Sequence, residues 1–334
     1  MRVTLKDIAD KAGYSISTVS RVLNGSEKIS EQVQKHIIKC AESLNYPFNK
    51  SAIPLYSNGS KSIILVTDFY EGEFYSSYFA GYSKAAKDLK VQLSLVSVSE
   101  NADEVIDTIS YHFQRKCDGI VLFIPSLERK DYTYIKNKLS EKEVDIPIVS
   151  NGLIENPILP TITFDGYSGG HIAAEHLHKK GYKKLGIVKG PPGKAESSFR
   201  YNGFIDYCHN KKIDVVWEFE GDFSFKSGLD AFYNLKEIKE KPDAVFCSSD
   251  LMAMGLYEGA REENIIIPSE LAIISYDNLP MCEHVRPKFS SIETDFISLG
   301  NHSLKTLTEL ISPTNNITSS LSFIPTTLIE REST

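Results

Sequence analysis

One pentapeptide of this 334-residue sequence has the spacing of a hydrolase active site. Residues 166–170 read GYSGG, a match to G-x-S-x-G between a predicted strand and a predicted helix, where a nucleophilic serine would stand. Ser168 would be the nucleophile, and Asp277 and then His284 or His302 follow in the hydrolase order. Because five-residue matches arise easily by chance, we keep hydrolase activity only as an alternative.

Two other sequence patterns are weaker candidates for a metal site or a phosphate-binding loop. His171, Glu175 and His178 share one face of a predicted helix, but they lack the H-E-x-x-H spacing of zinc enzymes, and a solvated polar face explains them better. GPPGK at 190–194 lacks the register of a phosphate-binding loop, and no G-x-G-x-x-G is present. The sequence therefore predicts no catalytic residue, no metal site and no cofactor.

Polar and aromatic side chains also follow the ends of predicted strands. Ligands of open α/β sheets bind beyond the carboxyl ends of the strands, so such residues are candidates for a binding site. They are Asp68, Phe74, Tyr75, Ser126, Asn151, Asp165, Ser249 and Asp277.

The elements that position these residues alternate between strands and helices from Ser62 onward. Strand-like apolar segments lie at 63–66, 93–98, 119–124, 146–150, 161–164, 185–188, 215–219, 244–249 and 271–276. Amphipathic helices separate them, for example at 76–89, 105–115, 170–180 and 251–263. Buried strands that alternate with helices predict parallel doubly wound sheets. About ten strands exceed one compact sheet, so we expect two lobes with a ligand cleft between them.

The first 49 residues have a different pattern. Residues 5–12 and 16–23 each show the apolar spacing of a short helix, and Gly13 between them favours a turn. Two such helices joined by a tight turn, followed by a third, predict a helix-turn-helix head, although a helical hairpin within a larger core shows the same periodicity. Candidate DNA contacts are hydroxyl or amide groups suited to phosphates, together with side chains that point away from the packed side. They are Thr4, Ser15, Thr18, Ser20 and Asn24, and Ile16, Ser17 and Arg21.

Charge and cysteine content indicate the cellular environment of the protein. The net charge is −7, but residues 1–60 hold eight Lys and Arg against five Asp and Glu, so only the head is basic. Five scattered cysteines without metal spacing indicate a reducing cytoplasm. No segment approaches the roughly 18 apolar residues of a membrane span, and residues 1–30 contain no apolar leader segment. We expect a cytoplasmic protein without membrane contact.

The head also carries a specific resemblance. VTLKDIADKAGYSISTVSRVLNG resembles the T-x-x-D-I-A-x-x-A-G-x-S-x-x-T-V-S-R-V-L-N pattern of the LacI/GalR family of bacterial transcription regulators, and the last residues, FIPTTLIERES, are similar to that family's terminus. The resemblance implies a repressor that binds a near-palindromic double-stranded operator as a homodimer. Its core is expected to resemble a periplasmic sugar-binding protein. The rivals are the hydrolase core and a sugar-binding module whose head binds a protein.

The resemblance divides the chain into a head at 1–49, a hinge at 50–61 and a core at 62–334. Lobe 1 takes about 62–163 and 293–322, and lobe 2 about 164–292 and 323–334. In the hinge, Leu55 falls where the family wedges a leucine into the minor groove. Pro54 departs from the pattern, since proline disfavours a helix interior, so a plain linker without a hinge helix is the alternative.

The resemblance also narrows the effector site. EFYSSYFAG places Phe74 and Tyr75 at the cleft mouth, with Glu73 in place of the usual Pro. SSFRYNGF, GDFSFKSG, FCSSDLMAMG and ISYDN place Arg200, Phe223, Ser249 and Asp277 on the effector, beside Ser126 from the strand-end argument. One cation, one anion and one aromatic face suit a carbohydrate. A purine or a partner protein remains the alternative.

Overall fold

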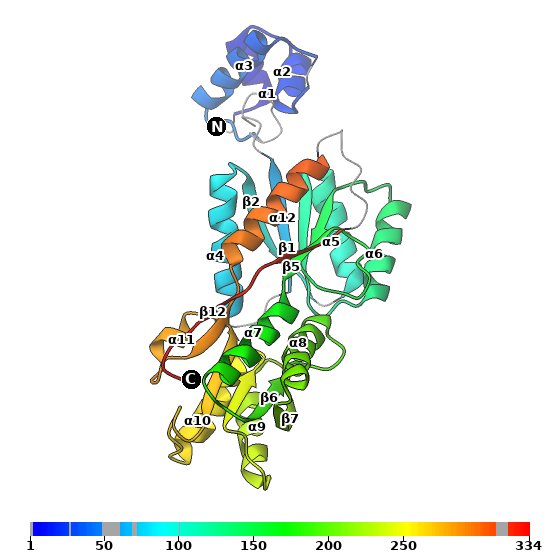
Figure 1. Cartoon of the computed structure of the whole chain (residues 1–334). Coiled ribbons are helices and arrows are strands. Elements are labelled where there is room, and N and C mark those ends of the chain that lie inside the picture. The colour runs from blue at the N-terminus through cyan, green and yellow to red at the C-terminus, as the bar shows by residue number, and fades with distance from the viewer. Residues whose placement is uncertain (1–2, 27, 49–60, 69–71, 100, 312–319) are drawn as a thin grey trace.

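The computed structural model describes residues 3–26, 28–48, 61–68, 72–99, 101–311 and 320–334. Figure 1 shows a small helical head above two α/β lobes stacked one below the other. This is the predicted class: an α/β chain with a three-helix helix-turn-helix head and a two-lobed core of doubly wound sheets. Among the described residues, no helix is long and apolar enough to cross a membrane.

Three helices form the head: α1 (Leu5–Ala12), α2 (Ile16–Leu23) and α3 (Glu31–Ser43). Thr4 and Asp7 cap the start of α1 reciprocally, and Gly13 ends it with φ of 73°, a conformation that favours glycine. Ile8, Val19 and Ile37, one from each helix, are almost completely buried in the common core. Burial of these apolar faces holds together helices that are too short to be stable alone.

Lobe 1 is built on a six-stranded sheet in the order β11-β5-β4-β3-β1-β2. The strands are β1 (Ser62–Thr67), β2 (Gln92–Ser97), β3 (Gly119–Phe123), β4 (Ile148–Ser150), β5 (Thr161–Phe164) and β11 (Leu321–Ile324). Helices α4 (Glu73–Asp88) and α12 (Phe296–Ile311) cover one face, and α5 (Ala102–Gln114) and α6 (Arg129–Glu141) cover the other. Successive residues of β1 enter the two cores alternately, as the two-residue period of a strand requires.

Lobe 2 repeats this plan in the order β12-β10-β9-β8-β6-β7, and only the β10–β12 pair is antiparallel. The strands are β6 (Lys184–Lys189), β7 (Asp214–Glu220), β8 (Ala244–Cys247), β9 (Ala272–Asp277), β10 (Ser290–Glu293) and β12 (Thr327–Ile329). Helices α7 (Gly166–Lys179) and α8 (Ala195–Lys211) cover one face, and α9 (Phe225–Glu237) and α10 (Asp250–Glu262) cover the other. The short helix α11 (Met281–His284) follows β9.

The chain passes between the sheets three times. β5 ends in lobe 1 and α7 begins lobe 2, β10 ends in lobe 2 and α12 returns to lobe 1, and β11 in lobe 1 precedes β12 in lobe 2. The boundary expected between 322 and 323 falls inside β11, which belongs to lobe 1 up to Ile324. β10, β11 and β12 lie outside all the predicted strand segments.

Candidate DNA-binding and effector sites

The exposed side of α2 gathers the candidates for base contact. Ile16, Ser17 and Arg21 are exposed, whereas Val19, Val22 and Leu23 on the opposite side are buried in the head core. Ile16 remains 49% exposed, although an isoleucine in a head this small would ordinarily be buried. An apolar group and a guanidinium therefore lie free on one helix face.

The remaining head candidates lie around this face, and several of their side chains cap helices. Thr4 Oγ1 accepts the Asp7 amide at 3.4 Å, and Ser15 Oγ accepts the Thr18 amide at 3.1 Å. Asn24 Nδ2 donates to Ser20 Oγ at 3.3 Å at the end of α2. These bonds fix the ends of α1 and α2, and therefore the angle at which α2 is presented. Leu55, Pro54 and the rest of the expected hinge lie outside the described residues.

The buried guanidinium of Arg200 is the centre of the candidate effector site in lobe 2. Arg200 Nη2 lies 3.6 Å from Asp277 Oδ1, and Arg200 Nη1 donates to the carbonyl of Ser248. The guanidinium carbon also lies 3.8 Å from the ring centre of Tyr276 and 5.3 Å from that of Phe223. One hydrogen bond, the nearby Asp277 carboxyl and two aromatic rings therefore hold the guanidinium in place.

The Phe223 ring packs directly against a glycine of lobe 2. Its backbone has φ of 69°, in the left-handed region that a bulky residue rarely adopts. A Cβ on Gly190 would lie 2.3 Å from the tip of the Phe223 ring, so only glycine leaves room for this side chain. The ring is partly exposed and closes one side of the Arg200 site.

Asp277 occupies a constrained loop at the end of β9. Asp277 and Asn278 have φ of 115° and 55°, and hydrogen bonds from neighbouring segments hold them there. The Leu279 amide donates to Asp250 Oδ2 at 2.6 Å, and the Asn278 amide donates to Ser291 Oγ at 3.0 Å. Within the described residues, Asp277 Oδ1 is buried and accepts no hydrogen bond, so a ligand donor could bind it.

The other lobe 2 candidate, Ser249, has a structural partner. Its Oγ accepts the Met252 amide at 3.3 Å as the N-cap of α10. The Oγ atoms of Ser248 beside it and of Ser126 in lobe 1 are buried without a hydrogen-bond partner among the described residues. Of the two adjacent serines, Ser248 is thus the one whose hydroxyl has no partner within the described residues, and sequence reasoning overlooked it.

On the lobe 1 side, Phe74 and Tyr75 lie at the start of α4. Phe74 packs edge-on against Phe296, with ring centres 5.3 Å apart, and lies 6.0 Å from Phe123. The Tyr75 hydroxyl donates to Asp68 Oδ1 at 3.1 Å, and burial, with the nearby Asp68 carboxylate, raises the Tyr75 pKa. Tyr75 is therefore part of the lobe 1 core, and Phe74 packs against that core, at the start of α4.

Asn151 and Asp165, the remaining strand-end candidates, have internal partners. Asn151 Oδ1 accepts the hydroxyls of Tyr78 and Tyr82 at 2.7 and 2.5 Å. Asp165 Oδ1 accepts the Ser168 amide at 2.9 Å as the N-cap of α7. Both residues therefore hold secondary structure in place.

Two charged residues that the sequence prediction missed lie between the lobes. Lys194 Nζ donates to the carbonyl of Ser126 at 3.2 Å, and Glu196 Oε1 accepts the Leu153 amide at 2.8 Å. Burial raises the pKa of Glu196, and the neighbouring Arg200 opposes this rise. Glu196 lies four residues before Arg200 on α8, and this spacing was the signal available in the sequence.

The residues of the hydrolase pattern have packing roles. Ser168 Oγ donates to Asp165 Oδ2 at 2.6 Å, which keeps the serine at the helix cap. A Cβ on Gly170 would lie 2.0 Å from the carbonyl oxygen of Arg200, so this glycine permits the close approach of α7 and α8.

The histidine pattern on α7 also has structural partners. The His171 ring packs edge-on against Tyr207, and His178 Nδ1 lies 3.0 Å from the Tyr207 hydroxyl. Glu175 pairs with Lys179. Across the described part of the chain, no group of three or more His, Cys, Asp or Glu side chains could hold a metal ion.

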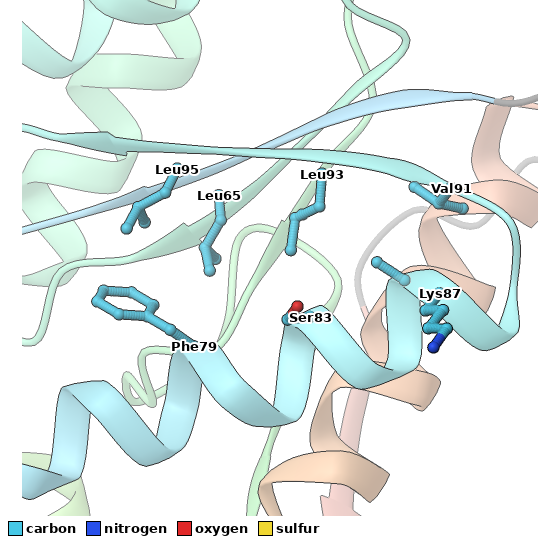
Figure 2. A pocket seen from close by; sticks show the side chains of 8 residues that line it. Leu65, Phe79, Ser83, Lys87, Val91, Leu93 and Leu95 are labelled. Carbon is cyan, nitrogen blue, oxygen red and sulfur yellow. The ribbon is translucent and has the colours of Figure 1, made fainter.

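Figure 2 shows a partly apolar groove between α4 and the edge strand β2 of lobe 1. The Arg200 site belongs to lobe 2. Phe79, Ser83 and Lys87 line it from the helix, and Leu93 and Leu95 line it from the strand. Leu95 is 50% exposed. An edge strand that exposes a leucine in this way is a surface that another chain can cover.

We expect Asp277 to make the stability of the fold depend on pH. Burial raises its pKa to about 8, Arg200 opposes the rise, and Asp250 adds to it. Its unfolded pKa is about 3.9. The folded state therefore holds an extra proton between these values, and the resulting stability is lost as pH rises toward 8. Between pH 5 and pH 8, urea unfolding should show a smaller loss of unfolding free energy in Asp277→Asn than in the wild type.

The exposed Asp230→Asn on α9 is the control for this measurement, and its pH profile should follow the wild type. Parallel profiles for wild type and Asp277→Asn would contradict the raised pKa.

Comparison with known families agrees with this geometry. Residues 4–49 match the family model described as bacterial regulatory proteins of the lacI family, and residues 174–334 match that of a periplasmic binding protein-like domain. The first span contains α1, α2 and α3, and the second contains most of lobe 2 together with α12 and β11.

Similar proteins cover nearly the whole chain. The HTH-type transcriptional repressor PurR of Actinobacillus pleuropneumoniae serotype 3 is 26% identical over 92% of this chain and 91% of its own length, and that of Proteus mirabilis is 28% identical over 92% and 90%. Among solved structures, the lac repressor dimer bound to operator and the anti-inducer ONPF aligns with a TM-score of 0.81 at 23% identity, over 100% of this chain and 99% of that chain. The regulator CelR in complex with cellobiose aligns with a TM-score of 0.71 at 23% identity, over the full length of both chains. The chain belongs to the LacI/GalR family of bacterial transcriptional regulators.

Proposed function

We propose that this protein is a cytoplasmic transcriptional repressor that binds operator DNA through α2 and is controlled by a small molecule between its lobes. The observation that carries the proposal is the exposed side of α2, where Ile16, Ser17 and Arg21 face solvent in a head that matches the lacI family model. Arg21 suits the acceptor edge of a guanine, and Ile16 suits a thymine methyl. The full-length similarity to repressors supports a regulator rather than an enzyme.

The partner for the α4–β2 groove is a second copy of this chain. An exposed leucine, Leu95, on an edge strand beside a partly apolar groove is typical of a surface that an identical subunit covers. A two-fold dimer presents two equivalent heads, so its operator is a near-palindrome. Leu55 would add a minor-groove wedge between head and core, as in the family.

The effector is an uncharged ring compound that donates hydrogen bonds. The Asp277 carboxyl lies 3.6 Å from Arg200, and the rings of Tyr276 and Phe223 lie against the guanidinium, so a phosphate or carboxylate ligand would have to bind beside an acidic side chain. Asp277 Oδ1 and Ser248 Oγ, which accept no hydrogen bond within the described residues, and the partly exposed Phe223 ring suit a planar base or a sugar. The similarity to repressors named PurR favours a purine over the carbohydrate expected from sequence. Ser126, Phe74, Tyr75 and Ser249 complete the proposed site.

Arg21→Ala should weaken binding to a selected operator by about 1–3 kcal/mol and affect random duplex DNA much less, because a base contact is lost. The operator is first selected from a random duplex library, and affinities are then measured by fluorescence anisotropy at fixed salt. Lys35→Ala on α3, an exposed lysine paired with Glu31, is the matched control. Equal losses on both DNAs would assign Arg21 to phosphate contact alone.

Leu95→Asp should convert the dimer into a monomer, because it places a charge in the apolar α4–β2 interface. Analytical ultracentrifugation at micromolar concentration would measure this. Leu321→Asp is the matched control, since Leu321 is 40% exposed on β11, the opposite edge of the same sheet. If the dimer survives Leu95→Asp but not Leu321→Asp, the dimer interface lies at β11 instead.

A purine or sugar that binds the cleft should raise the melting temperature of the full-length protein, and Phe223→Ala should abolish that rise. Phe225→Ala, a similarly exposed phenylalanine at the start of α9, should retain it. A panel of purine bases, nucleosides, sugars and their phosphates supplies the probes. The same ligand must change operator affinity, since the coupling between two sites is reciprocal. A response confined to phosphorylated compounds would contradict the uncharged-effector proposal.

A further inference from the structure

Two glutamates reach from one lobe to the backbone of the other. Glu73 Oε2, at the start of α4 in lobe 1, accepts the Met281 amide of lobe 2 at 2.7 Å. Glu196 Oε1, near the start of α8 in lobe 2, accepts the Leu153 amide of lobe 1 at 2.8 Å. Each lobe therefore supplies one carboxylate acceptor and one backbone donor.

These two contacts lie at separate points along the cleft. Leu153 follows β4 and Glu73 follows β1, and β3 lies between those strands in the lobe 1 sheet. Glu196 follows β6 and Met281 follows β9, and β8 lies between those strands in lobe 2. With neighbouring strands about 4.8 Å apart, the two points are separated by about 10 Å. Contacts this far apart resist both opening and twisting of the lobes.

Each contact is also joined to an element of the effector site. Met281 lies four residues after Asp277, and Leu279 between them is buried in the lobe 1 core cluster. Glu196 precedes Arg200 by one helical turn, and the adjacent Lys194 adds a bond to the Ser126 carbonyl. Movement of either lobe would therefore strain these hydrogen bonds and, at the same time, displace Asp277 or Arg200.

The carboxylates are well placed to make strong hydrogen bonds. Both are in the first turn of a helix, where the helix dipole favours a negative charge, and both are only partly exposed. Glu73 stands where the resembling family usually has proline, a residue whose side chain accepts no hydrogen bond. The Glu73 contact is thus a feature of this chain's own sequence.

We propose that Glu73–Met281 and Glu196–Leu153 are two latches that hold the lobes closed over the effector site and set how readily the cleft opens. The latches concern lobe opening itself. Only their link to operator affinity rests on the proposed function. When the cleft opens to admit or release a ligand, both hydrogen bonds must break, because each carboxylate and its backbone donor belong to different lobes.

Hydrogen exchange measured by mass spectrometry on the full-length protein tests the latches directly, since the donors are backbone amides. Glu73→Ala should speed exchange at least about tenfold in the peptide around Met281 and also in the peptide around Leu153, because both amides are released by the same opening. Glu196→Ala should likewise speed exchange in the peptide around Leu153 and also in the peptide around Met281. Glu73→Gln and Glu196→Gln, which keep an acceptor oxygen, should recover much of the protection.

Glu258→Ala is the control, since Glu258 is only partly exposed and pairs with Arg261 inside α10, far from both contacts in sequence, and its exchange should match the wild type in both peptides. Acceleration confined to the mutated contact's own partner peptide would overturn the proposal, because it would show local loosening without lobe opening. Unchanged exchange in both peptides would overturn it as well.

Operator binding separates the latches from the regulatory function. The double variant Glu73→Ala/Glu196→Ala should change operator affinity in the same direction as each single variant and by a larger factor. Faster exchange with unchanged operator affinity would uphold the latches and count against coupling between cleft and head.

Discussion

The positive charge of Arg200 is buried, and the surrounding wall of lobe 2 is arranged to make that burial tolerable. An unpaired buried charge costs several kcal/mol, so the guanidinium needs an anion, an acceptor and polarisable surfaces around it. Asp277, the Ser248 carbonyl and the rings of Tyr276 and Phe223 supply them. Glycines make the arrangement possible: Gly170 lets α7 approach α8, and Gly190 leaves space for Phe223.

The loop that presents Asp277 shows how such a wall is kept in place. Two consecutive non-glycine residues with positive φ are costly, and they persist where the surroundings hold them. Asp250 supplies much of that hold, because it is completely buried and accepts the Leu279 amide and the Ser275 and Ser291 hydroxyls. Asp250 therefore holds the loop that carries Asp277, while being completely buried itself.

The sequence predicted the architecture well because strands buried on both faces and capped amphipathic helices leave clear periodic patterns. It failed where a role depends on three-dimensional neighbours. Ser249 and Ser248 are chemically identical in the sequence, and only the structure assigns the helix cap to Ser249 and leaves Ser248 without a partner. Glu196 and Lys194 could not be assigned to the lobe interface, because their partners Leu153 and Ser126 are contributed by another sheet. The strand β10 was missed because SSIE is short and polar.

The three short connections between the lobes restrict the motions that the molecule can make. They run from Phe164 to Gly166, from Glu293 to Phe296 and from Ile324 to Thr327, so at most two residues separate the elements they join. Sliding one sheet past the other would stretch at least one of these connections, whereas bending about a line through them would not. Relative movement is thereby reduced to nearly one degree of freedom. In lobe 1 that rotation carries α4 as a rigid 16-residue lever, with Glu73 and Phe74 at the cleft end and Phe79, Ser83 and Lys87 along the groove.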